Sequence, residues 1–278
     1  MTALEWDREG TRLYETGTSK GVLFRKNAAG TDYEDGVAWN GLTAVTESPS
    51  GAEETALYAD DQKYLSLRSA EEFGATVEAY TYPDEWAACD GSAAFEDGMY
   101  IGQQTRRGFA LSYVTKLGND SQGTDHGEKL HIIYNAMASP SQKSYATIND
   151  SPEAITFSWE ITTTPISFRN DLKPSATLTI DNTKVAPAIY AAIKDHIYGT
   201  ANTAPTLPTP QWIIDLVGSS TTYTYTAVST SSTGYATKNP NAEGWFEKTG
   251  SNPDKYTRSL DTVVDIETTY YTRSVASS

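Results

Sequence analysis

The residues best able to carry chemistry are three histidines and one cysteine, namely His126, His131, His196 and Cys89. His126 and His131 are five positions apart, and along a strand an odd separation points two side chains to opposite faces. Zinc sites need several Cys and His ligands at close spacing, and the chain has no H-E-x-x-H pattern. The sequence therefore predicts no metal site, ordinary polar or packed histidines, and a partly buried thiol at Cys89.

Ser19 is at the centre of Gly17-Thr18-Ser19-Lys20-Gly21, which has the G-x-S-x-G form of a nucleophile elbow. Such an elbow follows a buried strand and opens a helix. Here the flanking residues predict two short strands, Thr11 to Glu15 and Gly21 to Arg25, joined as a β-hairpin. We therefore expect a turn serine without a catalytic role.

Oxygen-bearing side chains gather between Asn119 and Glu128, as they would in a calcium loop. The segment lacks the ligand spacing of an EF-hand, so it favours a solvated turn, with a weak ion site as the alternative. Other carboxylates are common, but a glycosidase pair is defined by a separation in space that sequence does not supply. No glycine-rich phosphate loop occurs either. The sequence thus predicts no catalytic residue, no cofactor and no enzyme activity.

The composition indicates a folded, β-rich and acidic chain. Of its 278 residues, 38% are hydrophobic and 21% are charged, and its 18 tyrosines suit a pleated, half-buried surface. The 36 acidic residues outnumber the 21 basic ones, for a formal charge of −15, whereas phosphate backbones are bound through Lys and Arg. We expect no bound nucleic acid, no membrane-spanning helix and no secretory signal. A single cysteine fits a reducing cytoplasm.

Strand-like runs alternate with turns over the first part of the chain. These runs are Tyr33 to Thr46 with a turn at Asn40-Gly41, Phe73 to Tyr82, Phe109 to Leu117, Lys129 to Asn135, and Ala154 to Thr164. In the last run, apolar residues from Ile155 to Ile161 recur at period two, as in a half-buried strand. An antiparallel sheet is the economical interpretation.

One helix is predicted, between Thr183 and Tyr198, where apolar residues recur every four positions. Pro187 fits only its first turn, and Gly199 can end it. Three prolines between Thr200 and Pro210, with little to pack, indicate a linker. The expected organisation is a main domain at 1–199, a Pro-rich linker at 200–218 and a small β-rich extension at 219–278. Two copies of Tyr-Thr-Arg-Ser, at 256–259 and 271–274, fit a β-meander in that extension.

Several blocks of the chain, taken in order, carry a resemblance to a known family. The blocks are Tyr14 to Leu23, Ala79 to Trp86, Leu117 to Asp120 with Asp125 to Gly127, Leu130 to Ala136, and Asn149 to Ala154 through Trp159-Glu160. Over about residues 5–200 they resemble the major tail (tail tube) proteins of long-tailed bacteriophages. The agreement in order makes chance similarity a poor explanation.

The resemblance implies a mainly β fold, a tail-tube-type β-sandwich or barrel with one flanking α-helix, here with a small C-terminal β appendage. It implies a structural subunit of a siphophage virion tail, made in the host cytoplasm, whose hexameric rings stack into a conduit for DNA during ejection. The implied partners are copies of the same chain, the tape measure and other tail proteins, and DNA in transit without specific binding. A second hypothesis stays open, a virion surface module that binds carbohydrate or acts as a host adhesin, and it rests on Trp245, Phe246 and the tyrosines after residue 220.

The segment Glu47 to Asp61 is expected to be an extended loop that joins one ring to the next. Pro49 and Gly51 would form its tip, while Leu57 and Tyr58 are apolar residues in an acidic stretch and could be buried by a partner. The alternative is that Leu57 and Tyr58 begin the next strand and pack within their own subunit. The predicted inter-ring contact residues are Ser48, Pro49, Gly51, Glu53, Glu54, Leu57 and Tyr58.

Overall fold

The computed structural model describes residues 4–51, 53–148, 150, 153–169, 171–220, 223–228, 245–251, 254–259 and 270–275. Side chains are described as far as residue 218. The chain divides into two units, residues 1–213 and residues 214–278, and each is described by itself.

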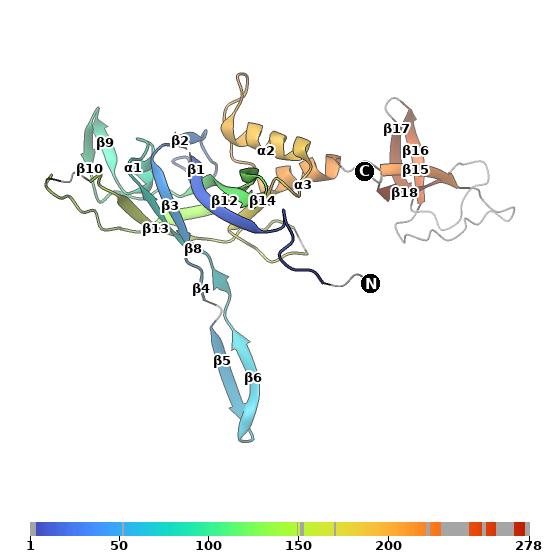
Figure 1. Ribbon diagram of the computed structural model, residues 1–278, viewed down its shortest axis with the longest axis horizontal. Helices are drawn as coiled ribbons and strands as arrows, with labels where there is room; N and C mark the ends of the chain where they lie inside the picture. The colour runs from blue at the N-terminus through green and yellow to red at the C-terminus, as the bar shows by residue number, and fades with distance from the viewer. Residues whose placement is uncertain are drawn as a thin grey trace. The chain divides into compact units, whose positions relative to one another are not determined.

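The first unit is built on an antiparallel sheet of eight strands (Figure 1). The strand order is β2-β1-β11-β12-β13-β8-β3, and β14 pairs with β12 off that path. The strands are β1 (Leu13–Arg25), β2 (Val37–Trp39), β3 (Leu42–Glu47), β8 (Gly74–Ala79), β11 (Phe109–Asn119), β12 (Gly123–Ala138), β13 (Phe157–Thr163) and β14 (Thr177–Asp181). The predicted mainly β fold is therefore confirmed, with an open sheet and not a closed barrel.

Strand β12 holds the sheet together because it pairs with β11 along one edge and with two strands in turn along the other. Residues 129–133 pair with β14, and residues 136–138 pair with β13. Between these stretches Asn135 has a φ of 49°, a left-handed conformation that Asn tolerates better than most residues. The strand changes partner at this residue.

The main core is aromatic and lies on one face of the sheet. Trp39 and Trp86 have ring centroids 4.7 Å apart, and Trp159 lies 5.7 Å from the first and 5.3 Å from the second. Trp86 belongs to the single-turn helix α1 (Trp86–Cys89), which places both of its ends in this core. Alternate residues of the same strands, such as Phe24 and Ile132, are also buried. The second face is therefore covered as well.

Helix α2 (Pro187–Tyr198) contributes to that cover. It begins at Pro187 and is followed by Gly199, whose φ is 71°, so the predicted helix and both of its limits are confirmed. Ile189, Ile193 and Ile197 are buried at its four-residue spacing. Tyr190 and Lys194 both donate to Oε1 of Glu128 on β12, at 3.0 and 2.6 Å, which ties the helix to the sheet.

The expectation of one flanking helix is wrong, because α1 and α3 (Pro210–Ser220) are also present. Thr209 caps α3: its hydroxyl accepts the backbone N–H of Trp212 at 3.2 Å, and Pro210 takes the first helical position. The Thr-Pro pair is a helix-start signal inside a segment that the prolines alone mark as a linker.

The expectation that residues 200–210 have little to pack is also wrong. Leu207 and Pro208 are buried, and the buried hydroxyl of Tyr134 donates to the carbonyl of Pro208 at 2.9 Å. The backbone N–H of Thr206 donates to the carbonyl of His196 at 2.8 Å. These residues belong to the first unit, while the proposed domain limits stay a prediction.

The chain also departs from prediction near Ser19. Thr11 to Arg25 does not form a hairpin, because β1 runs through as one strand that pairs with β11 from Leu13 to Arg25. Gly17 and Lys20 have φ values of 71° and 53°, and they produce two irregularities in the pairing. Left-handed residues here make bulges and do not reverse the chain.

The second unit contains a four-stranded antiparallel sheet in the order β15-β18-β16-β17. Its strands are β15 (Tyr223–Val228), β16 (Trp245–Ser251), β17 (Asp254–Ser259) and β18 (Tyr270–Val275). The two Tyr-Thr-Arg-Ser copies lie on β17 and β18, with β16 between them. The side chains of Trp245 and Phe246 lie outside the described part, so the binding-module hypothesis stays untested.

Candidate assembly surface

Residues 48–73 form a projecting hairpin, called the arm below. It contains β4 (Ser50–Gly51) paired with β7 (Glu71–Glu72), and β5 (Glu54–Ala59) paired with β6 (Gln62–Arg68). The arm joins the neighbouring strands β3 and β8, and at its root the N–H of Ser48 donates to the carbonyl of Gly74 at 2.8 Å. Figure 1 shows it leaving the sheet and extending away from it.

The end of the arm is the turn Asp60–Asp61, between the paired residues Ala59 and Gln62. Both aspartates have positive φ, 51° and 60°, as the type I′ turns of two-residue hairpins require. The expectation that Pro49 and Gly51 form the tip is therefore wrong, since they lie at the root. Gly51 is needed there because its φ is 84° and a Cβ would be 2.4 Å from the carbonyl oxygen of Ala70.

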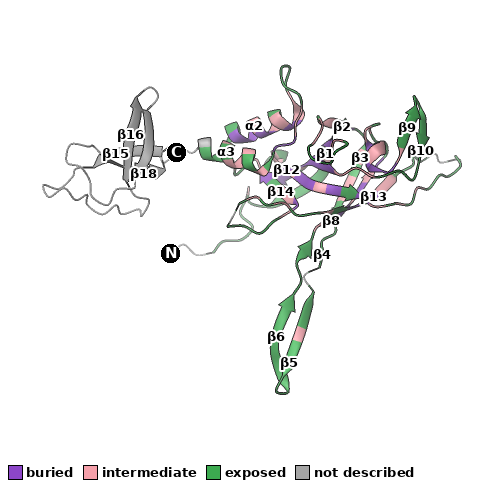
Figure 2. Ribbon diagram, turned by 180° about the vertical axis from the view of Figure 1, so that it is seen from behind, coloured by how far each residue is buried: buried purple, intermediate pink, exposed green. Residues whose placement is uncertain are grey.

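Large apolar side chains on the arm are exposed to water. Leu57 is 42% exposed and Tyr58 is 73% exposed, although both are on a strand. Three more lie on the facing strand and were not predicted: Tyr64, Leu65 and Leu67. Figure 2 shows almost the whole arm as exposed. Two acidic turn residues between two short runs rich in Leu and Tyr were the signal that could have identified this hairpin.

Glu53 and Glu54 of the predicted contact set have different roles. Glu53 is exposed, and its carbonyl accepts the N–H of Ser69 at 3.3 Å. The carboxylate of Glu54 accepts hydrogen bonds from Lys63 and Ser66 and lies 3.6 Å from Arg68. The bonds from Lys63 and Ser66 lower the pKa of Glu54. Glu54 therefore fastens the two strands of the arm together.

A second exposed ribbon is formed by β9 (Ala93–Glu96) and β10 (Met99–Ile101). Phe95, Met99, Tyr100 and Ile101 are each about half exposed or more, at 60%, 54%, 51% and 49%. This ribbon was not predicted, although its Asp97-Gly98 turn is a strong hairpin signal. The first unit thus presents apolar side chains on two separate hairpins.

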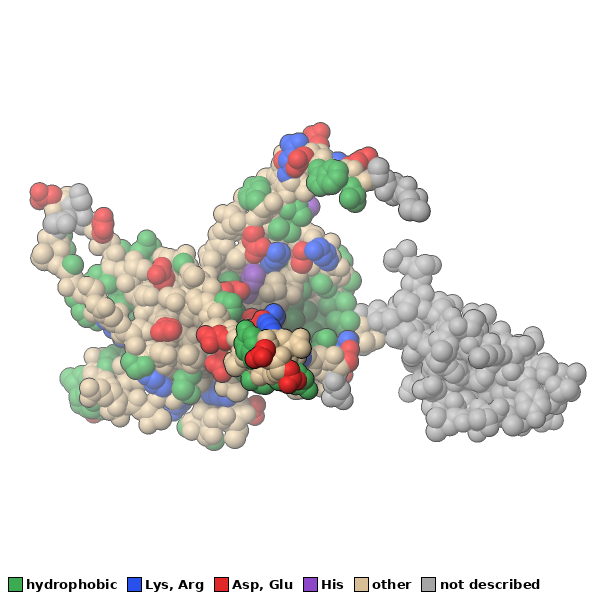
Figure 3. Space-filling view, turned by 90° about the horizontal axis from the view of Figure 1, so that it is seen from below, with side chains coloured by type: hydrophobic (Ala, Val, Ile, Leu, Met, Phe, Trp, Pro, Cys, Tyr) green, Lys and Arg blue, Asp and Glu red, His purple; other side chains and the backbone are tan. Residues whose placement is uncertain are grey.

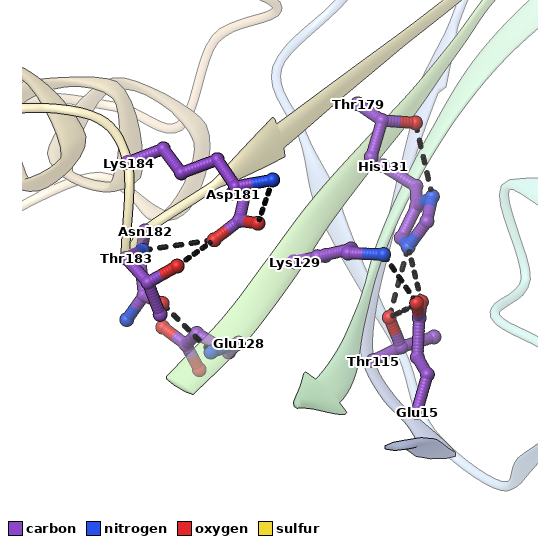
Figure 4. Close-up of polar contacts among 10 residues, drawn as sticks. All are labelled: Glu15, Thr115, Glu128, Lys129, His131, Thr179, Asp181, Asn182, Thr183 and Lys184. Carbon is purple, nitrogen blue, oxygen red and sulfur yellow. Dashed lines mark hydrogen bonds and ion pairs between the residues drawn. The ribbon is translucent and has the colours of Figure 1, made fainter. Parts of the chain in front are cut away.

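His131, one of the residues that could carry chemistry, is hydrogen-bonded to other side chains of the main sheet. Around His131, Nε2 lies 2.9 Å from the hydroxyl of Thr115, and Nδ1 lies 3.3 Å from that of Thr179 (Figure 4). Tyr113 stacks on the ring, with centroids 4.7 Å apart. Burial lowers the pKa of His131, although the nearby Glu15 opposes this. The imidazole, with both nitrogens engaged, joins strands β11, β12 and β14.

Glu15 completes this cluster from β1. Burial alone would raise the pKa of its carboxyl, but hydrogen bonds from Lys129 and Thr115 outweigh burial and lower it. On the neighbouring loop of Figure 4, the side-chain oxygen of Asn182 accepts the backbone N–H of Glu128 at 2.9 Å. Asp181 accepts the backbone N–H of Thr183 at 2.9 Å. These groups satisfy one another and fix the end of β14.

The other candidate residues are equally engaged. The side-chain oxygen of Asn119 accepts the N–H groups of Ser121 and Gln122, at 3.2 and 2.6 Å, as in a tight turn. His196 stacks on Trp212, with centroids 4.2 Å apart. Cys89 is completely buried, not partly as expected, and burial raises its pKa to about 12. Among the described residues, no three His, Cys, Asp or Glu side chains are grouped to hold a metal ion.

Within the described ranges, no helix is both long enough and apolar enough to span a membrane.

No family model matches the chain, and no curated protein matches it. Seven chains of solved structures match, among them one from the six-fold symmetrised cryo-EM structure of the anti-feeding prophage (AFP) baseplate. The alignment covers 64% of this chain and 97% of that chain, with 8% sequence identity and a TM-score of 0.32. A likeness of that size does not establish a common fold.

Proposed function

We propose that the chain is a structural, non-catalytic subunit of a siphophage tail tube, forming stacked hexameric rings that conduct DNA during ejection. The arm is the observation that carries the proposal. It presents five large apolar side chains to water on a hairpin that has no core of its own. An isolated two-stranded hairpin is at best marginally stable in water. Burial against another copy would hold the arm in place.

The energetics favour self-assembly as the use of this surface. Fully covering a Leu- or Phe-sized side chain contributes about 1.5 to 3 kcal/mol, less what is already buried. Contiguous exposed apolar patches on soluble proteins commonly mark interaction sites. The arm and the β9–β10 ribbon each supply such side chains. A stacked ring needs contacts within each ring and between rings, and the two hairpins give the subunit separate apolar surfaces for such contacts.

The sequence blocks that resemble tail tube proteins also support this proposed function. Tyr14 to Leu23 lies on β1, Leu130 to Ala136 on β12, and Trp159-Glu160 on β13. These three blocks thus lie on strands of the main sheet, while the block Ala79 to Trp86 runs from the end of β8 to the start of α1. A chain with a formal charge of −15 would also hold passing phosphates weakly, as a conduit must. We propose the tape measure and other tail proteins as further partners, and the virion tail as the location of the protein.

The proposal is tested with the purified chain at increasing concentration. We expect the sedimentation coefficient to rise with concentration, and negative-stain images to show rings or tubes whose end-on averages have six-fold symmetry. Assembly is concentration-dependent because burial of the exposed hairpins needs a second copy. A mass that stays monomeric at high concentration, with neither rings nor tubes on the grids, would contradict the proposal.

A further inference from the structure

One groove of the first unit stands out against the acidic balance of the chain. It has a volume of about 680 Å³ and is lined by three cations, Lys26, Arg106 and Arg107, and by no carboxylate. The polar residues beside them, including Asn135 and Thr164, are neutral. We call this cavity the basic groove. It is suited to an anionic group that can also accept hydrogen bonds.

Two of the three cations retain capacity for another anion. Lys26 donates to the amide oxygen of Asn135 at 2.6 Å and lies 5.6 Å from the centroid of the Tyr33 ring, and it forms no ion pair with a carboxylate in the described part of the chain. Arg107 is 3.5 Å from Glu34, a carboxylate that already accepts two hydrogen bonds from Arg25. Arg106 is more fully used, because it donates to the backbone carbonyls of residues 138 and 139 and lies 3.7 Å from the buried carboxylate of Asp90.

The arm carries the opposite charge. Residues 53–72 contain six acidic and two basic side chains, for a formal charge of −4. Both basic residues, Lys63 and Arg68, are paired with Glu54. Asp60 and Asp61 at the turn are exposed and form no ion pair among the described residues. Figure 3, viewed from the side on which the arm projects, shows acidic and hydrophobic side chains together on the nearest part of the arm.

We propose that the turn Asp60–Asp61 of one copy docks in the basic groove of a second copy. The inference rests on the proposed self-assembly and names the contact that it uses. The arm extends about 40 Å from Ser48 to Asp60, at about 3.3 Å per residue, and it points away from its own sheet (Figure 1). The turn is therefore placed where a second molecule can reach it. Opposite charges then set which surfaces of the two copies meet.

A double-mutant cycle tests this contact. Asp60→Asn with Asp61→Gly removes both charges and keeps a dipeptide favoured in type I′ turns. Lys26→Gln with Arg107→Gln removes two of the three positive charges of the groove and leaves the backbone contacts of Arg106 intact. At low salt, each pair of changes should raise the critical concentration for assembly about tenfold. All four changes together should raise it no further, because each pair removes the same contact.

The matched control is Glu71→Gln with Glu72→Gln, which removes two charges from the same arm at its root. It should assemble like the wild type. Wild-type assembly should also weaken with added salt, while the turn and groove variants lose most of that dependence.

Three results would overturn the inference. A turn variant that assembles like the wild type would exclude the aspartates, even while the self-assembly proposal stands. If the combined variant raises the critical concentration by the product of the two separate factors, the turn and the groove take part in separate contacts. DNA is the other anionic molecule that could occupy the groove, and fluorescence anisotropy with a short labelled duplex tests for it. If the wild type binds the duplex and the groove variant does not, the groove is a nucleic-acid site. If the wild type forms no assemblies at all, this inference fails together with the proposed function.

Discussion

At the level of single residues, the polar cluster around His131 ties four strands of the sheet together. His131 and Lys129 come from β12, Thr115 from β11, Thr179 from β14 and Glu15 from β1. The residue types would suit acid–base chemistry, but each polar atom is already occupied by a neighbour on the same sheet. The cluster therefore acts as a cross-strand connection, and its titration should affect stability.

The first prediction concerns this titration. Burial lowers the pKa of His131 below its ordinary value of 6.5, so below that pH the unfolded chain binds a proton that the folded chain does not. The free energy of unfolding should therefore fall as pH falls from 6.5 through the folded pKa. Glu15 acts in the same direction at lower pH. Its lowered pKa gives stability that is complete above its ordinary value of 4.5 and is lost as pH falls through the folded value.

His131→Gln should reduce the pH slope between 6.5 and the acid transition, measured by urea unfolding at several pH values. Gln keeps one donor and one acceptor near Thr115 and Thr179, so most of the cross-strand bonding can remain. Burial also lowers the pKa of His196. The double change with His196→Gln should therefore flatten the slope further. An unchanged slope in both variants would show that neither histidine controls stability in this range.

At the level of elements, the arm differs from the rest of the first unit because its pairing is local and it has no second layer. Its root is fixed by the bond from Ser48 to Gly74 and by Phe73, which packs against the main core. Beyond the root, the strands depend on each other and on the Glu54 cluster. Such an element can be removed without disturbing the core, which makes its role testable.

The second prediction is that replacing residues 50–72 with a short Gly-Ser turn abolishes long tubes and preserves the fold. Because Phe73 and Ser48 are retained, the thermal midpoint should change little. Negative-stain images of this variant should show particles no larger than rings. Tubes of wild-type length would exclude the arm from the contact between rings, and a collapsed thermal midpoint would show that the arm supports the core.

At the level of the whole molecule, the end of the first unit is set by packing. Leu207 and Pro208 are buried, and Trp212 stacks on His196 just before the unit ends at Ile213. A cut after residue 210, which the proline pattern favours, would separate Trp212 from its stacking partner. A cut after Ser220 would keep all of α3.

The third prediction compares two truncated chains. Residues 1–220 should fold and assemble like the full chain, because the contacts of Leu207, Pro208 and Trp212 are kept. Residues 1–206 should lose stability. This chain lacks the carbonyl of Pro208, which accepts the hydrogen bond of the buried Tyr134 hydroxyl. Leaving that hydroxyl unsatisfied costs about 1 to 3 kcal/mol, and urea unfolding measures the difference in stability between the two chains. If residues 1–220 fold but form no tubes, the second unit is required for assembly.

The sequence by itself determined the features that depend on short-range pattern. Period-two alternation predicted β8 and β13, and four-residue spacing with Pro187 and Gly199 predicted α2 with both of its limits. These features follow from neighbouring residues, because side-chain direction and backbone conformation repeat within one element. The mainly β class follows from the same patterns.

The tertiary structure decided which segments meet. Gly17 and Lys20 are compatible with either a turn or a bulge, and only pairing with the distant β11 makes β1 one strand. Leu207 has no local signal for burial, because its environment comes from elements elsewhere in the chain. Leu57 and Tyr58 lie on a strand yet remain exposed, since no second layer covers the arm. Strand partners and burial depend on contacts between residues far apart in sequence, and local pattern does not encode them.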